Sequence, residues 1–253
     1  ANIKTKDFEF FQPEMERTDD SILCIATADW LLHGGEVSHY YSRYALEYPY
    51  PMGGYGGMFK AWSSKVARQG IHEPYNSCGN GSAMRIAPVG WAFETEREVL
   101  AAAEVSASCT HNHPEGIKGA QATALCIFLA RQGHTASDIR ARIERDFGYD
   151  LSMSVEELQR RYSWQGIDGK GDGGICQDSV PQAIICVLQA KDFEDAIRNA
   201  ISIGGDSDTI GCIAGGIAEA LYGIPESIKE RAWKYLDETE GCTVRSFIQK
   251  YSI

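Results

Sequence analysis

The chain has 253 residues, of which 43% are apolar and 23% are charged, values typical of a globular protein of one large domain. The net charge of -11 and the pI near 5.0 argue against binding of nucleic acid through a basic face. No apolar run approaches the roughly 20 residues that span a bilayer, so we expect a single domain that binds neither nucleic acid nor membrane.

The eight cysteines indicate a reducing compartment. They are scattered without a C-x-x-C pair, which fits neither a zinc site nor a compact disulfide framework, and several lie in apolar helical runs. Residues 1–11 are charged and mixed rather than continuously apolar, unlike a secretory signal. We therefore expect a cytoplasmic protein.

Helical periodicity dominates the chain. Strands are hard to place, because runs of alternating β-branched residues are short and the connecting segments 50–57 and 168–174 are rich in Gly, Pro and Asp. The second of these segments is the best candidate for a flexible excursion. We predict an all-α domain, with apolar residues recurring at three and four positions over residues 22–32, 99–108, 120–129, 180–188, 196–203 and 210–221.

Two of these helices have predicted boundaries. Pro181 suits the first turn of its helix, where the missing N–H costs nothing. The helix over residues 192–203 is expected to end at Gly204 and Gly205, because glycine readily adopts the left-handed conformation that closes a helix. This pair would bring Asp206 sharply to the start of the next helix.

Acidic residues cluster at two predicted helix starts, Thr18-Asp19-Asp20 and Asp206-Ser207-Asp208-Thr209. A single Asp or Thr at such a place is usually an N-cap, and capping is the alternative interpretation, above all for the first cluster. The second cluster holds more carboxylate than capping requires. The helix behind it also contains residues small enough for close packing: Gly211, Ala214, Gly215, Gly216, Ala218 and Ala220.

Carboxylates at the start of a tightly packed helix would incur a large desolvation cost that a bound cation removes. Aspartate and threonine oxygens are hard ligands, which select Mg²⁺, Mn²⁺ or Ca²⁺ over zinc. The two clusters together therefore predict a binuclear site, with ions roughly 3.5–4 Å apart as in other binuclear hydrolases.

Three further motifs lie between these clusters. The run Gly53-Gly54-Tyr55-Gly56-Gly57 lacks the spacing of a dinucleotide fingerprint or a P-loop, and by itself favours a flexible turn. The run 77–82 has the composition of a tight turn with an N-cap before a helix that begins near Ala83. Arg85 suits either a phosphate contact or a structural ion pair with a carboxylate, since a buried Arg is rarely unpaired.

The run 109–114 contains His111 and His113 ahead of a long helix, where histidine more often caps or donates hydrogen bonds than catalyses. Aromatic residues form a further cluster, which either flanks a cleft and stacks a nucleobase or packs in the core: Tyr40, Tyr41, Tyr44, Tyr48 and Tyr50.

Together, Thr18-Asp19-Asp20, Gly205-Asp206-Ser207-Asp208-Thr209 and the intervening 79–85 run resemble the ADP-ribosylglycohydrolase family, which includes dinitrogenase-reductase-activating glycohydrolase. The resemblance runs from about Asn2 to the C-terminal region. It implies an all-α bundle with two Mg²⁺ or Mn²⁺ ions at its centre. It also implies hydrolysis of the N- or O-glycosidic bond between ADP-ribose and a protein or small-molecule acceptor, with release of ADP-ribose.

The resemblance assigns roles to particular residues. It implies metal ligation by Thr18, Asp19, Asp20, Asp206, Asp208 and Thr209. It implies contacts with ADP-ribose by Gly54, Tyr55, Gly56, Ser77, Gly79, Asn80 and His111, with the glycines letting backbone N–H groups approach the diphosphate.

Members of the family usually open with a helix that carries a glutamate, the proposed acid/base or water-orienting group. In this sequence residues 2–8 correspond to the segment that follows, so we expect a domain over residues 1–253 without that first helix, and we assign no catalytic residue. Glu9, Glu14 and Glu16 do not match the family position. A low-activity or noncatalytic ADP-ribose-binding protein is therefore the alternative function, and an oligomer could cover the apolar groove left by the helix.

Overall fold

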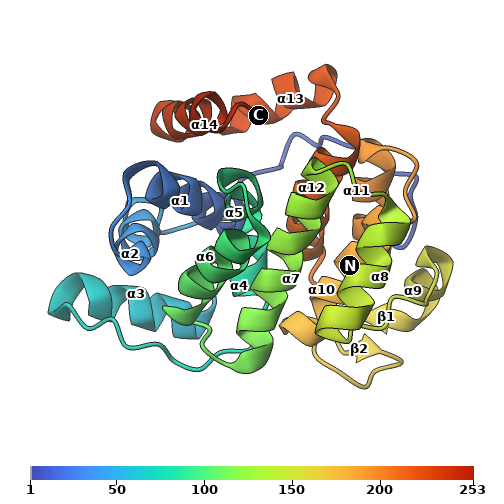
Figure 1. The fold of residues 1–253 in the computed structure, drawn as a ribbon, viewed down its shortest axis with the longest axis horizontal. Helices are drawn as coiled ribbons and strands as arrows, with labels where there is room; N and C mark the ends of the chain where they lie inside the picture. The colour runs from blue at the N-terminus through green and yellow to red at the C-terminus, as the bar shows by residue number, and fades with distance from the viewer. Residues whose placement is uncertain (1) are drawn as a thin grey trace.

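Helices make up most of the molecule, as the periodicity predicts. A computed structural model describes residues 2–253 (Figure 1). No helix in this part of the chain combines the length and hydropathy that crossing a bilayer would need. The α-helices are α1 Asp19–His33, α2 Val37–Glu47, α3 Gly57–Gln69, α4 Gly81–Met84, α5 Ala87–Ala92, α6 Glu96–Ser108, α7 Pro114–Arg131, α8 Ala136–Phe147, α9 Val155–Arg161, α10 Cys176–Leu188, α11 Phe193–Ser202, α12 Ser207–Tyr222, α13 Glu226–Ala232 and α14 Glu238–Tyr251.

Helix α7 forms the centre of the core. It is apolar around most of its circumference and packs against α4, α5, α6, α8, α10 and α12, which surround it in Figure 1. Such a helix suits a buried position, where no face needs to meet water. Gly119 permits the close approach of α10, because a Cβ at this position would stand 2.4 Å from the sulfur of Cys176. Helices α10, α11 and α12 pack against one another beside α7.

The start of α10 differs from the prediction for Pro181. The helix begins at Cys176, so Pro181 lies inside it rather than in its first turn. The earlier start is fixed by tertiary pairing, since the N–H of Cys176 donates to the carbonyl of Cys78 at 2.9 Å and Ile175 pairs with Gly79. Pro181 therefore leaves the carbonyl of Gln177 without its usual helical donor.

A short hairpin interrupts the helical pattern. Strands β1 (Tyr162–Ser163) and β2 (Gly166–Ile167) pair antiparallel, which the all-α prediction did not include. The following segment, 168–174, is tied to the body of the protein rather than being a free excursion. The N–H of Asn80 donates to the carbonyl of Gly174 at 3.0 Å, and the N–H of Asp172 donates to the Asp178 carboxylate at 2.8 Å.

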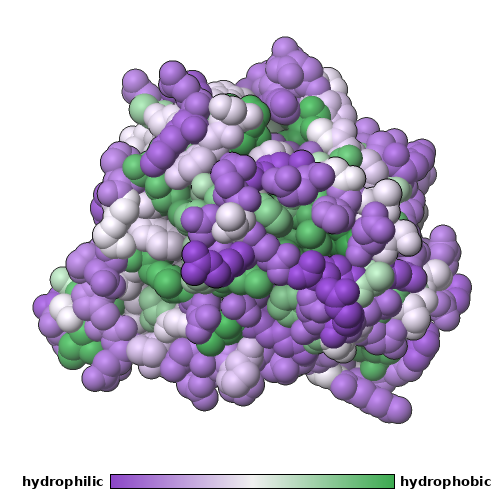
Figure 2. Space-filling model, in the orientation of Figure 1, coloured by the Kyte–Doolittle hydropathy of each residue, from purple (hydrophilic) through white to green (hydrophobic). Residues whose placement is uncertain are grey.

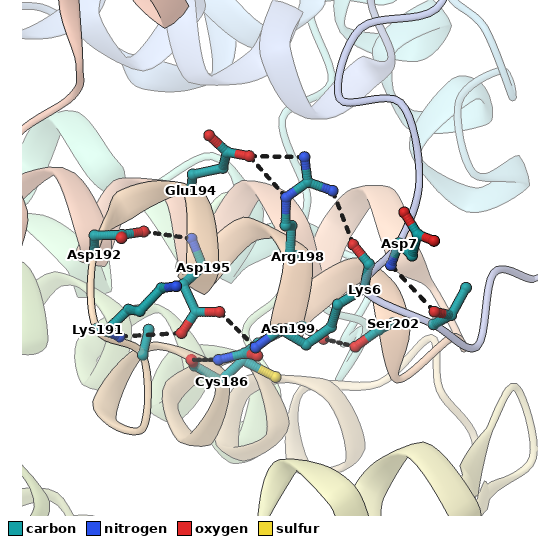
Figure 3. A network of polar contacts seen from close by, with 12 residues as sticks. Lys6, Asp7, Cys186, Lys191, Asp192, Glu194, Asp195, Arg198, Asn199 and Ser202 are labelled. Carbon is teal, nitrogen blue, oxygen red and sulfur yellow. Dashed lines mark hydrogen bonds and ion pairs between the residues drawn. The ribbon is translucent and has the colours of Figure 1, made fainter.

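The segment before α1 is held against α11 by side-chain contacts (Figure 3). Arg198 donates to the carbonyls of Lys6 and Phe8, both at 2.8 Å, while Lys6 forms an ion pair with Asp195. Nearer its start, the amide of Asn2 donates to the carbonyl of Gly205 at 2.8 Å. The segment thus crosses the turn between α11 and α12 before it leads into α1.

Helices α13 and α14 lie along one edge of the molecule in Figure 1, and α14 packs on α1. The carboxylate of Glu240 in α14 is fully buried and pairs with Arg17, immediately before the first acidic cluster. Figure 2 shows that the face drawn there is mainly hydrophilic, with hydrophobic residues in scattered patches between.

Candidate functional site

A cavity of about 660 Å³ lies where the two acidic helix starts meet the glycine-rich segments. Its lining includes every predicted site residue except Thr18 and Asp20, which are the sequence neighbours of the lining residue Asp19. The lining residues are Asp19, Leu23, Gly53, Gly54, Tyr55, Gly56, Gly57, Met58, Phe59, Tyr75, Ser77, Gly79, Asn80, Gly81, Met84, Arg85, His111, Trp164, Gly174, Asp206, Asp208 and Thr209.

Backbone pairing brings the distant segments to this cavity. Met52 pairs in parallel with Thr18, and its N–H donates to the carbonyl of Arg17 at 3.0 Å, which places the 53–57 run beside the start of α1. The pairing of Gly79 with Ile175 holds the 77–81 turn against the start of α10. The two glycine-rich segments, 53–57 and 77–81, which suggest flexible turns in the sequence, are therefore held in place beside the cavity by backbone pairing.

The acidic clusters do not act as helix caps. Thr18 and Asp206 occupy the N-cap positions of α1 and α12, yet neither side chain accepts a capping hydrogen bond. The hydroxyl of Thr18 donates instead to Oδ2 of Asp20 at 2.8 Å, and the amide of Asn80 donates to Oδ2 of Asp206 at 2.8 Å. The capping interpretation is therefore wrong for these two residues. The bond between Asn80 and Asp206 instead joins the 77–81 turn to the start of α12.

Glycine is required at the turn that delivers Asp206. Gly204 and Gly205 have φ angles of 73° and 74°, so the predicted left-handed closure of α11 is confirmed. A Cβ on Gly205 would stand 2.4 Å from the ring of Tyr162. Conformation and space both exclude a side chain there.

The carboxylates interact strongly with one another. Burial, and then the charge of Asp208, raises the pKa of Asp20 to about 7, although the hydrogen bond from Thr18 opposes the rise. Burial and Asp208 also raise the pKa of Asp19 to about 7. Because α1 packs against α12 and the charge of Asp208 acts on both Asp19 and Asp20, the two acidic helix starts lie close together.

Asp206 behaves in the same way. Burial raises its pKa to about 7, against the hydrogen bond from Asn80 and with the added repulsion of Asp208. Oδ1 of Asp20 is buried without a hydrogen-bond partner in residues 2–253. Several negative charges are thus close together with too few donors to stabilise them.

A hard divalent cation would suit this set of ligands in chemistry and charge. Carboxylate and hydroxyl oxygens are the ligands preferred by Mg²⁺ and Mn²⁺, and the cation would stabilise the ionised form of each acid. As the side chains stand, no three His, Cys, Asp or Glu residues in the described part of the chain converge closely enough to hold one metal ion. The fit therefore rests on the unpartnered oxygen of Asp20 and on the mutual repulsion of the acids.

The two histidines have different surroundings. His113 is the N-cap of α7, where its Nδ1 accepts the N–H of Glu115 at 3.1 Å. His111 lines the cavity and is 6% exposed. Burial and the positive charge of Arg85 hold the pKa of His111 well below its ordinary value of 6.5, so the ring is neutral at physiological pH.

Arg85 has no carboxylate partner among residues 2–253, so the expected structural ion pair is not formed. The guanidinium is fully buried, lies 3.9 Å from the centre of the Tyr41 ring, and donates to Thr110 and to the carbonyl of Ser106. An aromatic face and neutral oxygens replace the carboxylate. No acid in residues 2–253 therefore neutralises the charge of Arg85.

The tyrosines from residues 40–50 do not line the cavity. Tyr41 and Tyr44 are buried in the core, whereas Tyr50 is 89% exposed, so core packing is correct for the first two. The aromatic rings that line the cavity are those of Tyr55, Phe59, Tyr75 and Trp164.

Of these lining aromatics, sequence reasoning identified Tyr55 alone. A sequence signal existed for Trp164, because this aromatic residue lies just before the glycine-rich run 166–174. In the structure its side chain is 52% exposed, which is unusual for so large an apolar group. Phe59 and Tyr75 carried no such signal. They belong to a chain of ring contacts that runs from Tyr55 to His111 and depends on the packing of α3.

The N-terminal glutamates are remote from this chemistry. Glu9, Glu14 and Glu16 are exposed, and none of them lines the cavity. Within residues 2–253, the carboxylates that do line it are those of Asp19, Asp206 and Asp208.

Comparisons with known proteins agree on one family. The sequence profile of the family ADP-ribosylglycohydrolase matches residues 2–251. The chain is 30% identical to the Homo sapiens protein ADP-ribosylhydrolase ARH3, over 88% of this chain and 76% of that protein. It is 28% identical to the Rhodospirillum rubrum protein ADP-ribosyl-[dinitrogen reductase] glycohydrolase, over 63% of this chain and 53% of that one. A solved structure described as an ADP-ribosylglycohydrolase-related protein complex superposes with a TM-score of 0.68 at 25% identity, covering 92% of this chain and 81% of the other.

Proposed function

Because the chain belongs to the ADP-ribosylglycohydrolase family, we propose that it is a metal-dependent hydrolase that cleaves the glycosidic bond of ADP-ribosylated acceptors and releases ADP-ribose. The family supports the reaction class. The observation that carries the metal dependence is the contact of two acidic helix starts, where Asp19, Asp20 and Asp206 all have pKa values raised to about 7.

Six residues would hold two divalent cations, Mg²⁺ or Mn²⁺: Thr18, Asp19, Asp20, Asp206, Asp208 and Thr209. When bound, the cations would supply positive charge for the reacting oxygens and lower the pKa of a water molecule. The hydrogen bonds from Thr18 to Asp20 and from Asn80 to Asp206 fix the direction of two of these carboxylates.

The rest of the cavity suits ADP-ribose. The aromatic rings of Phe59, Tyr75 and Trp164 offer flat apolar surfaces for a nucleobase. The glycines at 53–57 and at 79–81 leave the backbone open for close approach by phosphate or ribose oxygens.

Two measurements separate an enzyme from a binding protein: release of ADP-ribose from its acceptors, and binding of ADP-ribose by calorimetry. Release of ADP-ribose from ADP-ribosyl-arginine, ADP-ribosyl-serine and O-acetyl-ADP-ribose is measured with Mg²⁺, with Mn²⁺ and with EDTA. We expect release from at least one substrate, with loss of activity in EDTA. Binding of ADP-ribose without release from any substrate would instead identify a noncatalytic binding protein.

Asp208→Ala tests the metal ligands directly. The side chain of Asp208 is exposed to the cavity, so its removal should cost little stability while turnover is lost. Asp7→Ala, an exposed acid outside the cavity, is the control. Unchanged metal-dependent turnover in Asp208→Ala would reject the proposed metal site.

A further inference from the structure

Arg85, Thr110 and His111 form a buried chain of hydrogen bonds that ends at the cavity. Nη2 of Arg85 lies 2.7 Å from Oγ1 of Thr110, and the same Oγ1 lies 2.7 Å from Nδ1 of His111. Arg85 and Thr110 are fully buried. Water is therefore excluded from this chain, and the three side chains must satisfy one another.

The direction of each proton follows from the donors and acceptors available. A guanidinium has only donors, so Oγ1 of Thr110 accepts from Arg85. The single hydroxyl proton of Thr110 can then go to Nδ1 of His111, at 2.7 Å, or to the carbonyl of Ala107, at 3.5 Å. Distance favours the imidazole nitrogen.

The carbonyl of Ala107 is also a poor acceptor for the hydroxyl of Thr110 because other donors already occupy it. Its carbonyl oxygen already accepts the backbone N–H groups of Thr110, at 3.1 Å, and of His111, at 2.7 Å. Both lone pairs of that oxygen are thus occupied. The hydroxyl of Thr110 is left with Nδ1 of His111 as its acceptor, and the adjacent positive charge strengthens the donated bond.

A neutral imidazole that accepts at Nδ1 carries its proton on Nε2. Nε2 of His111 faces the 79–81 turn, since a Cβ added to Gly81 or Gly79 would stand 3.1 or 3.5 Å from it. Within residues 2–253, no hydrogen-bond partner reaches this nitrogen. The ring is 6% exposed, and that exposure is toward the cavity.

We propose that Arg85 is a positioning residue that acts through Thr110 to hold His111 as the Nε2–H tautomer, which donates a hydrogen bond to an oxygen of the bound ligand. His111 is then a fixed donor and not a general base. The identity of the ligand rests on the function proposed above, whereas the tautomer does not.

Two other titratable groups lie beside this chain of hydrogen bonds. Tyr75 lies edge-on to His111 with ring centroids 5.7 Å apart, and Sγ of Cys109 lies 3.9 Å from Nη2 of Arg85. Burial raises the pKa of Tyr75 to about 12 and that of Cys109 above its ordinary value. Both groups are therefore uncharged near pH 7, and Arg85 is the charged group that acts on His111.

Nuclear magnetic resonance of the full chain, with ¹⁵N-labelled histidine, tests the tautomer. His111 is assigned among the six histidines by the signals that disappear in His111→Gln. We expect protonated Nε2 and unprotonated Nδ1 throughout pH 6–8. A protonated Nδ1 at pH 7, in either the neutral or the charged ring, would overturn the proposal.

Thr110→Val removes the hydroxyl while keeping the shape of the side chain, and Thr110→Ser restores the hydroxyl. We expect the ring nitrogens of His111 to exchange between tautomers in the valine variant and to match the wild type in the serine variant. An unchanged Nε2–H tautomer in Thr110→Val would show that Thr110 does not set it. If the valine variant does not fold, the wild-type spectrum decides by itself.

Calorimetry with ADP-ribose in Mg²⁺ tests the donated bond. We expect Thr110→Val to bind about tenfold more weakly than wild type, as for the loss of one hydrogen bond, and Thr110→Ser to bind within about twofold. Equal affinity in the two variants would refute the donation to ligand. Absence of ADP-ribose binding by the wild type would refute the proposed function, while the tautomer would still be decided by the spectra.

Discussion

Asp20→Asn replaces the most buried carboxylate of the site by an amide of nearly the same shape. Asp20 is 2% exposed, and the hydrogen bond that it accepts from Thr18 can equally be accepted by an amide oxygen. At pH 8 without divalent cations, the folded protein must bury the charge of Asp20, because its pKa is about 7. We therefore expect Asp20→Asn to be more stable than wild type under these conditions.

The magnitude follows from the pKa. It rises from the ordinary value of 3.8 to about 7, and one pH unit corresponds to about 1.4 kcal/mol, so the charge of Asp20 costs at most about 4 kcal/mol at pH 8. The gain should be smaller than this bound for two reasons. Part of the cost is repulsion between Asp20 and its neighbours Asp208 and Asp19, and the N–H₂ group of the new asparagine needs a hydrogen-bond acceptor. The expected gain in the free energy of unfolding is therefore about 1–3 kcal/mol.

The stability of the metal-free protein should depend on pH in one direction. Between about pH 4 and pH 7 the folded protein keeps protons on Asp19, Asp20 and Asp206 that the unfolded chain releases. Stability of the metal-free wild type should therefore fall as the pH rises through this window. Asp20→Asn should show a shallower fall, and the two proteins should have similar stability near pH 4.

Urea unfolding, followed by circular dichroism at pH 4–8 in EDTA and in Mg²⁺, measures these effects. A cation at one hundred times its dissociation constant stabilises the folded state by about 2.7 kcal/mol, and we expect most of this to be lost in Asp20→Asn. Asp7→Asn, at an exposed position, is the matched control. The reasoning is wrong if Asp20→Asn is the less stable protein in EDTA at pH 8, or if Mg²⁺ stabilises both proteins equally.

Three further predictions concern the support of the site. Gly205→Ala should lower the free energy of unfolding by about 3 kcal/mol, because a Cβ there would meet the ring of Tyr162. Gly133→Ala is the control, since Gly133 has a φ of 83° but no neighbour within 4 Å, and it should cost about 1 kcal/mol. Equal losses in the two variants would contradict the contact with Tyr162. Glu240→Gln should cost about 2 kcal/mol because Arg17 loses its buried partner, whereas exposed Glu238→Gln should cost under about 0.5 kcal/mol in the same urea titration. Trp164→Ala should weaken ADP-ribose binding about fivefold by calorimetry without loss of stability, and Tyr50→Ala should change neither; equal affinities would remove Trp164 from the site.

The helices with apolar periodicity were predictable because local sequence specifies them. The six predicted helical stretches coincide with α1, α6, α7, α10, α11 and α12, although the fifth extends one residue beyond the end of α11. The end of α11 at Gly204 and Gly205 followed from the conformational freedom of glycine. The chemistry of the ligands, and then the family resemblance, brought the two acidic clusters together across nearly two hundred residues. Helical periodicity alone does not show that two segments so far apart in the sequence lie close together in space.

Features fixed by tertiary contacts were not predictable in this way. The start of α10 is set by pairing with the 78–79 turn, so Pro181 could not reveal it. Arg85 was expected to need a carboxylate, and its partners are the ring of Tyr41 and two neutral oxygens from α6 and the residues after it. Which group neutralises or solvates a buried charge depends on the packing around it.

Acidic and basic groups line the same cavity, so binding of a cation and binding of an anion there should be coupled. Asp19, Asp206 and Asp208 are among its lining residues, and so are Arg85 and His111. The diphosphate of ADP-ribose would be attracted by the guanidinium of Arg85 and repelled by the three carboxylates. A cation held by the carboxylates would offset that repulsion, so nucleotide affinity and metal affinity should each increase the other by the same factor. If the proposed metal site is correct, the two aspartate clusters should therefore affect nucleotide binding as well as metal binding.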